Sequence, residues 1–372
     1  SEMCIRDSQE RVAVEIARGC PHGCRFCQAT FINRPYRERR LGPILAQALA
    51  ALDSSGFEAV SLLSLSALDH SEIEALVERL VGELEPRGVA LTFPSTRVDC
   101  FDVALFGRAD YMGRPGVTLA PEAGSERLRR VINKGASREQ LLSVVAQAFA
   151  AGWNLVKLYY MIGLPTEGQE DLEALVEEVR AVHLLASQRR GGRRPRLRLS
   201  IATFIPKPHT PFQWERQIGS EETEERQRAI LTGLRLKGTE VSWHEARQTA
   251  LEGALSRGDR RLGPVISHAV AGGARFDNWS DQFRWEIWER AFASAGLDIG
   301  EFLREREEDE LLPWDVIDVG VGKAFLLTER RRAYQGEPTP DCRTECAGCE
   351  IAAAAGGNGV CPARQAPLFV SS

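Results

Sequence analysis

The 372-residue sequence has no apolar run close to the roughly 18 residues that a transmembrane helix needs, and no signal peptide opens it. It also lacks a strong excess of either charge, because 47 Lys and Arg stand against 52 Asp and Glu, a formal net charge of −5. A global basic field for nucleic acid is therefore excluded. With 43% hydrophobic residues the chain is neither disordered nor fibrous, so we expect a folded cytoplasmic protein without a membrane partner.

Cysteine, in contrast, is unusually frequent, with nine residues in the chain. Seven of them form two clusters: Cys20, Cys24 and Cys27 near the start, and Cys342, Cys346, Cys349 and Cys361 near the end. In a protein without a secretory signal, clustered cysteines bind metal more often than they form disulfides. The sequence therefore predicts a metal-dependent protein.

Strand-like and helix-like segments alternate from residue 11 to about residue 213. The apolar pattern predicts six strands, at residues 12–16, 59–63, 89–93, 117–119, 155–162 and 197–205. Segments with helical spacing separate them, which indicates six βα units, an α/β fold class and a parallel sheet. Six strands are too few for the usual closed barrel, so a partial barrel and an open doubly wound sheet both fit. In either fold, loops at the carboxyl ends of the strands carry the chemistry.

The chain divides into four parts. Residues 1–10 fit no pattern and are set aside as a non-native or truncated edge. Residues 11–217 form the core domain, and residues 218–337 are expected to be mainly helical, because strand signals fade there. Residues 338–372 form a short Gly- and Cys-rich tail, which cannot bury a core of its own without a staple.

The strongest motif is Cys20-x3-Cys24-x2-Cys27, directly after the first predicted strand. Three thiolates this close can hold three corners of a cubane iron–sulfur cluster, which ordinarily takes four cysteine ligands. The fourth iron is then open to a substrate or cofactor, like the open position of a catalytic zinc. Gly19 and Gly23 allow the backbone to pass close to the metal. A zinc site at the same cysteines is the alternative.

With Phe26 at the aromatic position, this motif resembles the signature of the radical S-adenosylmethionine (radical SAM) superfamily, whose fold is a partial (βα)6 barrel. The resemblance continues through residues 15–39, 61–66, 120–127, 157–167 and 204–214. Together these stretches resemble radical SAM proteins of unassigned substrate that are linked to a cobalamin (B12)-binding domain. Methylthiotransferases and the Elp3-like group are the wider kin.

The resemblance implies an enzyme that binds a [4Fe-4S] cluster through Cys20, Cys24 and Cys27. Such an enzyme reductively cleaves S-adenosylmethionine to a 5′-deoxyadenosyl radical, with an electron donor such as flavodoxin or ferredoxin. Methyl or methylthio transfer is one use of this chemistry among its kin. Cobalamin would bind to a domain that this chain does not contain. The substrate is unknown, with RNA as one candidate.

The resemblance also assigns contacts to S-adenosylmethionine. Phe26 would help to place the adenine, and Arg97 would pair with the methionine carboxylate as a planar fork. The second strand usually ends in a Gly-Gly-Glu-like turn, but here Ser64 and Ser66 stand in its place. Buried hydroxyls bonded to their own backbone are the alternative for these two serines.

Three further strand ends receive roles by the same resemblance. Glu122 would accept bonds from the ribose hydroxyls, unless it complements a helix dipole instead. Gly163 and Pro165 resemble an adenine-binding turn, for which a plain strand-to-loop turn is the alternative. Ile205 and Pro206 would supply backbone contacts to adenine.

Two questions stay open at this level. The tail cysteines fit an auxiliary iron–sulfur cluster, a structural zinc site or a tail without metal, and deleting everything after Pro340 is expected to leave the first cluster assembled. The alternative function is a non-catalytic iron–sulfur or zinc protein that binds RNA. It would use the arginine-rich residues 189–198, which also fit a solvated loop.

Overall fold

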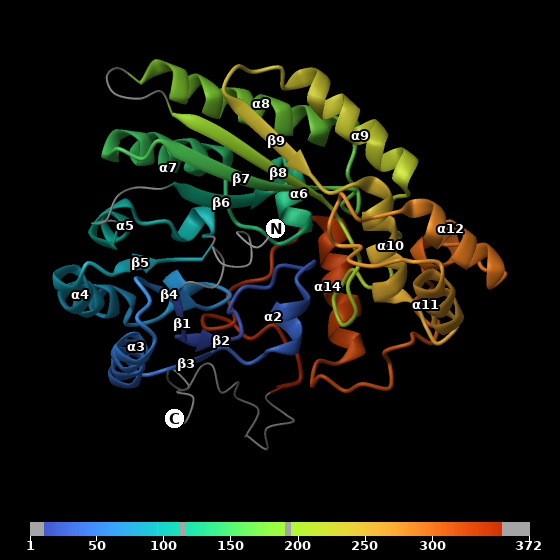
Figure 1. Ribbon diagram of the computed structural model, residues 1–372, viewed down its shortest axis with the longest axis horizontal. Coiled ribbons are helices and arrows are strands. Elements are labelled where there is room, and N and C mark those ends of the chain that lie inside the picture. The colour runs from blue at the N-terminus through green and yellow to red at the C-terminus, as the bar shows by residue number, and fades with distance from the viewer. Residues whose placement is uncertain (1–10, 95, 110, 112–115, 190–194, 352–372) are drawn as a thin grey trace.

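The computed structural model describes residues 11–94, 96–109, 111, 116–189 and 195–351 (Figure 1). Its two main sheets are parallel. The first has the order β1-β4-β5, with β1 at Val12–Glu15, β4 at Ala59–Leu63 and β5 at Ala90–Thr92. The second has the order β6-β7-β8-β9, with β6 at Val117–Glu122, β7 at Leu155–Ile162, β8 at Arg196–Thr203 and β9 at Thr239–Trp243. A parallel bridge between Thr96 and Leu119 joins them, so the strands follow one another around one open arc.

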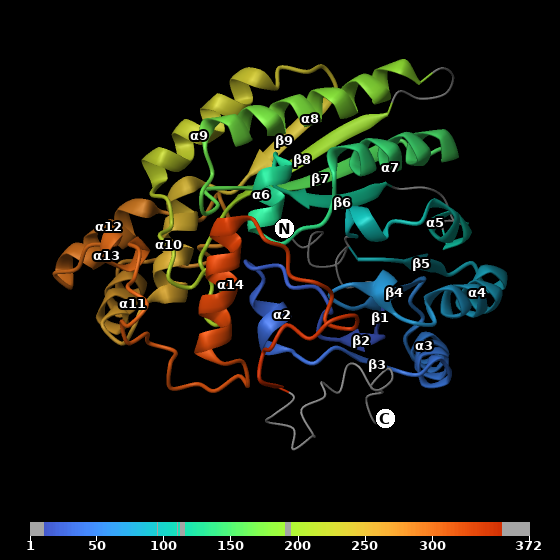
Figure 2. The ribbon, with the colours of Figure 1, turned by 180° about the vertical axis from the view of Figure 1, so that it is seen from behind.

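Helices cover the outer side of this arc, as Figures 1 and 2 show. They are α3 (Leu41–Ser55), α4 (Ile73–Leu84), α5 (Val103–Ala109), α7 (Arg138–Ala151), α8 (Gln169–Gln188) and α9 (Ser220–Gly233). Their apolar faces pack on the strands: Leu76 of α4 lies in one core with Leu62 of β4, and Val179 of α8 in another with Leu158 of β7. The predicted α/β architecture with parallel sheets is confirmed.

Residues 218–337 are mainly helical, as expected from the sequence. After α9 come α10 (Ala246–Arg257), α11 (Leu262–Ala271), α12 (Trp285–Ser294), α13 (Gly300–Leu303) and α14 (Lys323–Gln335). Helices α10 to α13 pack around their own apolar core, which includes Trp288 and Phe302. None of the helices in the described ranges is long and apolar enough to cross a membrane.

Strand β9 is the element of this region that the sequence analysis missed. It pairs with β8 at the edge of the second sheet. Its residues alternate between half-buried and exposed, with Glu240 and Ser242 on the exposed face. A strand that buries only one face in part has too weak an apolar pattern to stand out from a loop.

Helix α14 brings the end of the described chain back to the inner side of the arc (Figures 1 and 2). Its Ala333 is buried in a core with Leu128, Val131 and Phe204, which follow β6 and β8. The segment after α14 therefore starts beside the carboxyl ends of the strands, where the first cysteine cluster also lies.

Candidate functional site

The three cysteines of the first motif lie on one tight loop at the carboxyl end of β1. Cys20 and Cys24 are buried and Cys27 is half-buried. The backbone N–H of Cys27 donates to the Cys24 carbonyl (3.0 Å), and Cys27 is the N-terminal cap residue of the short helix α2 (Gln28–Ile32). Gly19 has φ +81°, and a Cβ there would lie 2.6 Å from the carbonyl oxygen of Asn33. Only glycine therefore allows the chain to enter the loop this closely.

The surroundings of these thiols fit a metal group. Burial raises the pKa of Cys20 to about 12 and also raises the pKa of Cys27. A metal ligand must be a thiolate, and a bound cation supplies the charge that ionises buried thiols. The residues present therefore suit a cationic group held by Cys20, Cys24 and Cys27.

The guanidinium group of Arg97 contacts the cysteine loop. Its Nη1 donates to Cys24 Sγ at 3.3 Å, and its Nε and Nη2 donate to the Asp99 carboxylate at 2.9 and 2.7 Å. Burial opposes the charge of Arg97, but the charges of Cys24 and Asp99 outweigh burial and raise its pKa. Three of the five N–H donors thus have partners, and the second N–H groups of Nη1 and Nη2 are left for the predicted pairing with a methionine carboxylate.

Arg25 lies between Cys24 and Cys27 in the sequence, and its side chain anchors the loop to neighbouring segments. It is fully buried, and its Nε donates to Glu329 of α14 at 3.2 Å. Its terminal nitrogens donate to the carbonyls of Arg130 (3.0 Å), Val131 (3.1 Å) and Glu337 (2.7 Å). The cysteine loop is therefore fixed both to α6 (Glu126–Val131) and to the segment after α14. Nothing in the spacing of the cysteine motif indicates this role for Arg25.

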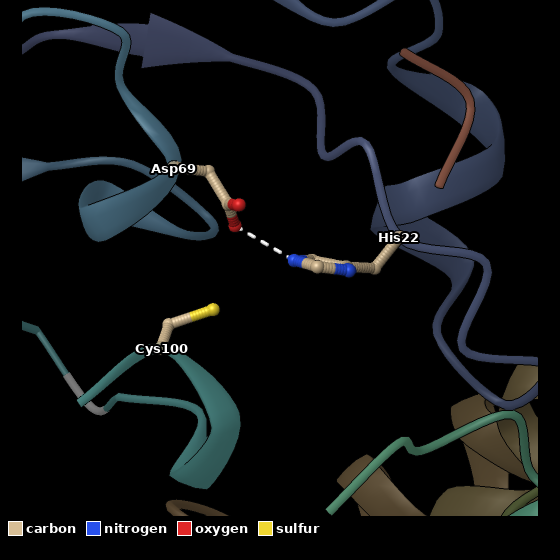
Figure 3. Close-up of side chains that lie close together, drawn as sticks. All are labelled: His22, Asp69 and Cys100. Atoms are coloured by element: carbon tan, nitrogen blue, oxygen red, sulfur yellow. Dashed lines mark hydrogen bonds and ion pairs between the residues drawn. The ribbon is translucent and has the colours of Figure 1, made fainter. Parts of the chain in front are cut away.

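A second group of side chains combines His22 of the loop with Asp69 and Cys100 (Figure 3). Among the described residues, His22, Asp69 and Cys100 are the one group of three potential ligands whose donor atoms all lie within 4.8 Å of one another. Asp69 Oδ2 pairs with His22 Nε2 at 2.7 Å and accepts the Ser66 hydroxyl at 2.5 Å. Arg343 Nη2 lies 2.7 Å from Asp69 Oδ1. Burial alone would raise the Asp69 pKa, but these partners lower it below its usual range, so a metal is not needed to balance the carboxylate.

The two serines after β4 take different roles. Ser64 Oγ accepts the backbone N–H of Ser66 at 3.3 Å, which is the local backbone bond given as the alternative. Ser66 Oγ instead donates to Asp69, one of the three residues drawn in Figure 3.

Glu122 ends β6 in a strained conformation, with φ +69°. Burial raises the pKa of its carboxyl group, against the opposing charges of Lys134, whose Nζ lies 3.4 Å away, and Arg97. Helix α6 begins four residues later and is capped by the side chain of Ser125, which accepts the Leu128 N–H. A strained, half-buried carboxylate at a strand end is a feature that clusters at functional sites.

Gly163, at the end of β7, also needs its glycine. Its φ is +77°, and a Cβ there would lie 2.7 Å from Ile218 Cδ1. Its N–H donates to Glu167 Oε1 at 2.8 Å, which closes the turn that contains Pro165. Phe26 packs in the apolar core that includes Leu164 and Phe204.

The remaining predicted site residues follow strand β8 or helix α14. Ile205 and Pro206 follow β8 at the same edge of the sheet, Ile205 half-buried and Pro206 buried. Cys342, Cys346 and Cys349 follow α14, and Cys361 lies outside the described residues.

The arginine-rich stretch lies at the opposite end of the strands. Arg189 Nη1 donates to Asn154 Oδ1 at 2.6 Å, and Arg198 pairs with Glu240 at 2.6 Å. Both positions adjoin the amino end of β8, and residues 190–194 lie outside the described ranges. The described part of this stretch therefore lies at the other end of the strands from the cysteine loop, and RNA binding through it stays a prediction.

Known proteins match the core of this chain. Residues 14–179 match the model of the Radical SAM superfamily. An uncharacterised protein of Methanocaldococcus jannaschii is 32% identical over 256 residues, covering 69% of this chain and 54% of that protein. The tRNA-2-methylthio-N(6)-dimethylallyladenosine synthase of Tropheryma whipplei is 26% identical over 239 residues, covering 61% of this chain and 47% of the synthase. The chain thus spans about half the length of these two relatives.

Among solved structures, the radical S-adenosylmethionine methyltransferase TsrM from Kitasatospora setae, with cobalamin and a [4Fe-4S] cluster bound, is similar over 55% of this chain and 38% of its own. The identity is 17% and the TM-score is 0.44.

Proposed function

Residues 14–179 are a radical SAM domain, and from that premise we propose that this protein is an enzyme that binds a [4Fe-4S] cluster and reductively cleaves S-adenosylmethionine. The observation that carries the proposal is the loop of Cys20, Cys24 and Cys27 at the carboxyl ends of the parallel strands. It presents three thiols, two of them buried, and Arg97 donates to one of them, Cys24 Sγ. Three cysteine ligands leave one iron of a cubane cluster for S-adenosylmethionine.

When bound and reduced, the cluster supplies the electron that splits S-adenosylmethionine into methionine and a 5′-deoxyadenosyl radical. The protein holds and shields the reactants. Arg97 donates to Cys24 Sγ, and Arg25 keeps the loop fixed to α6 and α14. Glu122, a half-buried carboxyl group with a strained backbone at the end of β6, is suited to accept bonds from the ribose hydroxyls. Gly163 lets the backbone approach the adenine closely.

The named relative extends the proposal to a reaction class. Similarity to a tRNA-2-methylthio-N(6)-dimethylallyladenosine synthase favours methylthio or methyl transfer, with RNA as the first substrate class to test. A one-electron donor such as flavodoxin or ferredoxin would reduce the cluster.

Anaerobic reconstitution with iron and sulfide tests the function. The protein is reduced with dithionite in the presence of S-adenosylmethionine, and methionine and 5′-deoxyadenosine are quantified by mass spectrometry. Wild type and a Cys4→Ala control, whose cysteine belongs to neither cluster, should form both products, whereas Cys24→Ala should form none. Wild-type cleavage by Cys24→Ala, or a colourless zinc-loaded wild type that forms neither product, contradicts the proposal.

A further inference from the structure

The segment after α14 lies directly against the first cysteine loop. The backbone N–H of Cys342 donates to the carbonyl of Pro21, the neighbour of Cys20, at 3.0 Å. Asn133 Nδ2 bridges the two segments, donating to the carbonyls of Gly23 (3.1 Å) and Thr339 (3.0 Å). In Figures 1 and 2 this red segment passes beside the blue start of the chain. Two cysteine motifs from opposite ends of the sequence thus meet at one place.

Arg343 fixes the position of the second motif. Its Nη2 lies 2.7 Å from Asp69 Oδ1, and its Nη1 donates to the Asp69 carbonyl at 2.8 Å. Its guanidinium also lies over the ring of Tyr36, 5.7 Å from the centroid. Cys342 is therefore held by its own backbone on one side and by the side chain of its neighbour on the other.

The second motif repeats the spacing of the first, since Cys342-x3-Cys346-x2-Cys349 and Cys20-x3-Cys24-x2-Cys27 are both C-x3-C-x2-C. Residues 338–349 contain no helix or strand. The chain turns at Asp341, whose carbonyl accepts two successive N–H groups, and again at Gly348, which has φ +78°. Cys349 packs against an apolar cluster that includes Trp314. A segment this irregular, with three cysteines among its turns, is typical of a fold held by metal.

We propose that Cys342, Cys346 and Cys349 bind a second iron–sulfur cluster, docked against the loop of the first. A tetrahedral zinc site with Zn–S bonds of about 2.3 Å brings its thiolates to roughly 3.8 Å from one another. Within the described ranges, only His22, Asp69 and Cys100 form a ligand triplet narrower than 4.8 Å, so both cysteine motifs are wider than a zinc site requires. The shared C-x3-C-x2-C spacing points to the same kind of group in both places.

Metal counting on the full-length chain tests this inference independently of S-adenosylmethionine cleavage. The tail variant carries Cys342→Ser, Cys346→Ser and Cys349→Ser, and the matched variant carries Cys20→Ser, Cys24→Ser and Cys27→Ser. Serine at position 342 keeps the N–H that donates to Pro21, and Arg343 keeps its ion pair. The tail thus remains docked while its thiols are removed.

After anaerobic reconstitution, iron, sulfide and zinc are measured per chain. Wild type should hold about eight irons, and each triple variant about four, the content of one cubane cluster. The single variant Cys346→Ser, which changes an exposed thiol, should also lower iron and serves where the triple variant fails to fold. Unchanged iron in both tail variants, or loss of zinc instead of iron, overturns the inference. Formation of 5′-deoxyadenosine by the tail variant is a separate readout, which bears on the proposed function alone.

Discussion

Replacing Arg25 by methionine tests whether the buried ion pair between Arg25 and Glu329 anchors the cysteine loop. Arg25 is 0% exposed, and its ion-pair partner Glu329 is 1% exposed. Methionine keeps much of the aliphatic length but removes the charge and every donor. Breaking a buried ion pair by removing one partner costs about 3–5 kcal/mol, because the other charge stays buried. We expect that loss in the free energy of unfolding, together with reduced iron uptake, since Arg25 directly follows Cys24 in the loop.

The control is Arg332→Met, which breaks the other arginine contact to the same carboxylate. Arg332 Nη1 also lies 3.2 Å from Glu329, but its side chain is 37% exposed. An exposed pair of this kind contributes about 1 kcal/mol or less. Urea unfolding of the iron-free proteins, followed by tryptophan fluorescence, measures both losses. Iron per chain after reconstitution is measured separately. Equal losses in the two variants would refute the argument that burial makes Arg25 the anchor.

Three further changes follow from the same geometry. Gly19→Ala places a Cβ 2.6 Å from the Asn33 carbonyl oxygen, so iron uptake should fall several-fold. Gly82→Ala, in α4 with open space around it, should instead raise the free energy of unfolding by about 0.5–1 kcal/mol. Equal changes of iron uptake and of stability in the two glycine variants would contradict this. Because burial raises the pKa of Glu122, its contribution to stability is complete below the ordinary value of 4.5 and is lost as pH rises through the folded-state value. Urea titrations at several pH values should show that loss in wild type and not in Glu122→Gln; identical profiles would count against it. Deletion after Pro340 should lower the iron of the first cluster as well. Iron below half the wild-type content would support this expectation, and iron at half the wild-type content would contradict it.

That last expectation reverses the one drawn from sequence. The tail looked independent because its composition cannot form a core. The structure joins it to the first loop directly through the Cys342 N–H, and indirectly through Arg343, whose partner Asp69 pairs with His22 of the loop. The deletion removes both Cys342 and Arg343.

Local patterns were sufficient for most of the fold. Strands β4 and β7 have the predicted limits, because each carries a clear apolar face over its whole length. The cysteine motif could also be recognised, since its three residues are close in the chain.

Contacts between distant segments could not be predicted in this way. His22 and Asp69 are 47 residues apart, Arg25 and Glu329 are 304 apart, and Asp69 and Arg343 are 274 apart. No spacing rule connects such pairs, because each pairing depends on how the strand order and α14 bring their loops together. A single sequence shows each of these residues only as an ordinary polar side chain.

Electron paramagnetic resonance of the reduced tail variant tests whether S-adenosylmethionine binds at the cluster of Cys20, Cys24 and Cys27, because that variant isolates this cluster. Spectra are recorded with and without S-adenosylmethionine, and 5′-deoxyadenosine is measured in the same samples. Binding of S-adenosylmethionine at the iron without a cysteine ligand predicts a change in the g values and formation of 5′-deoxyadenosine. Identical spectra with no 5′-deoxyadenosine would contradict the account.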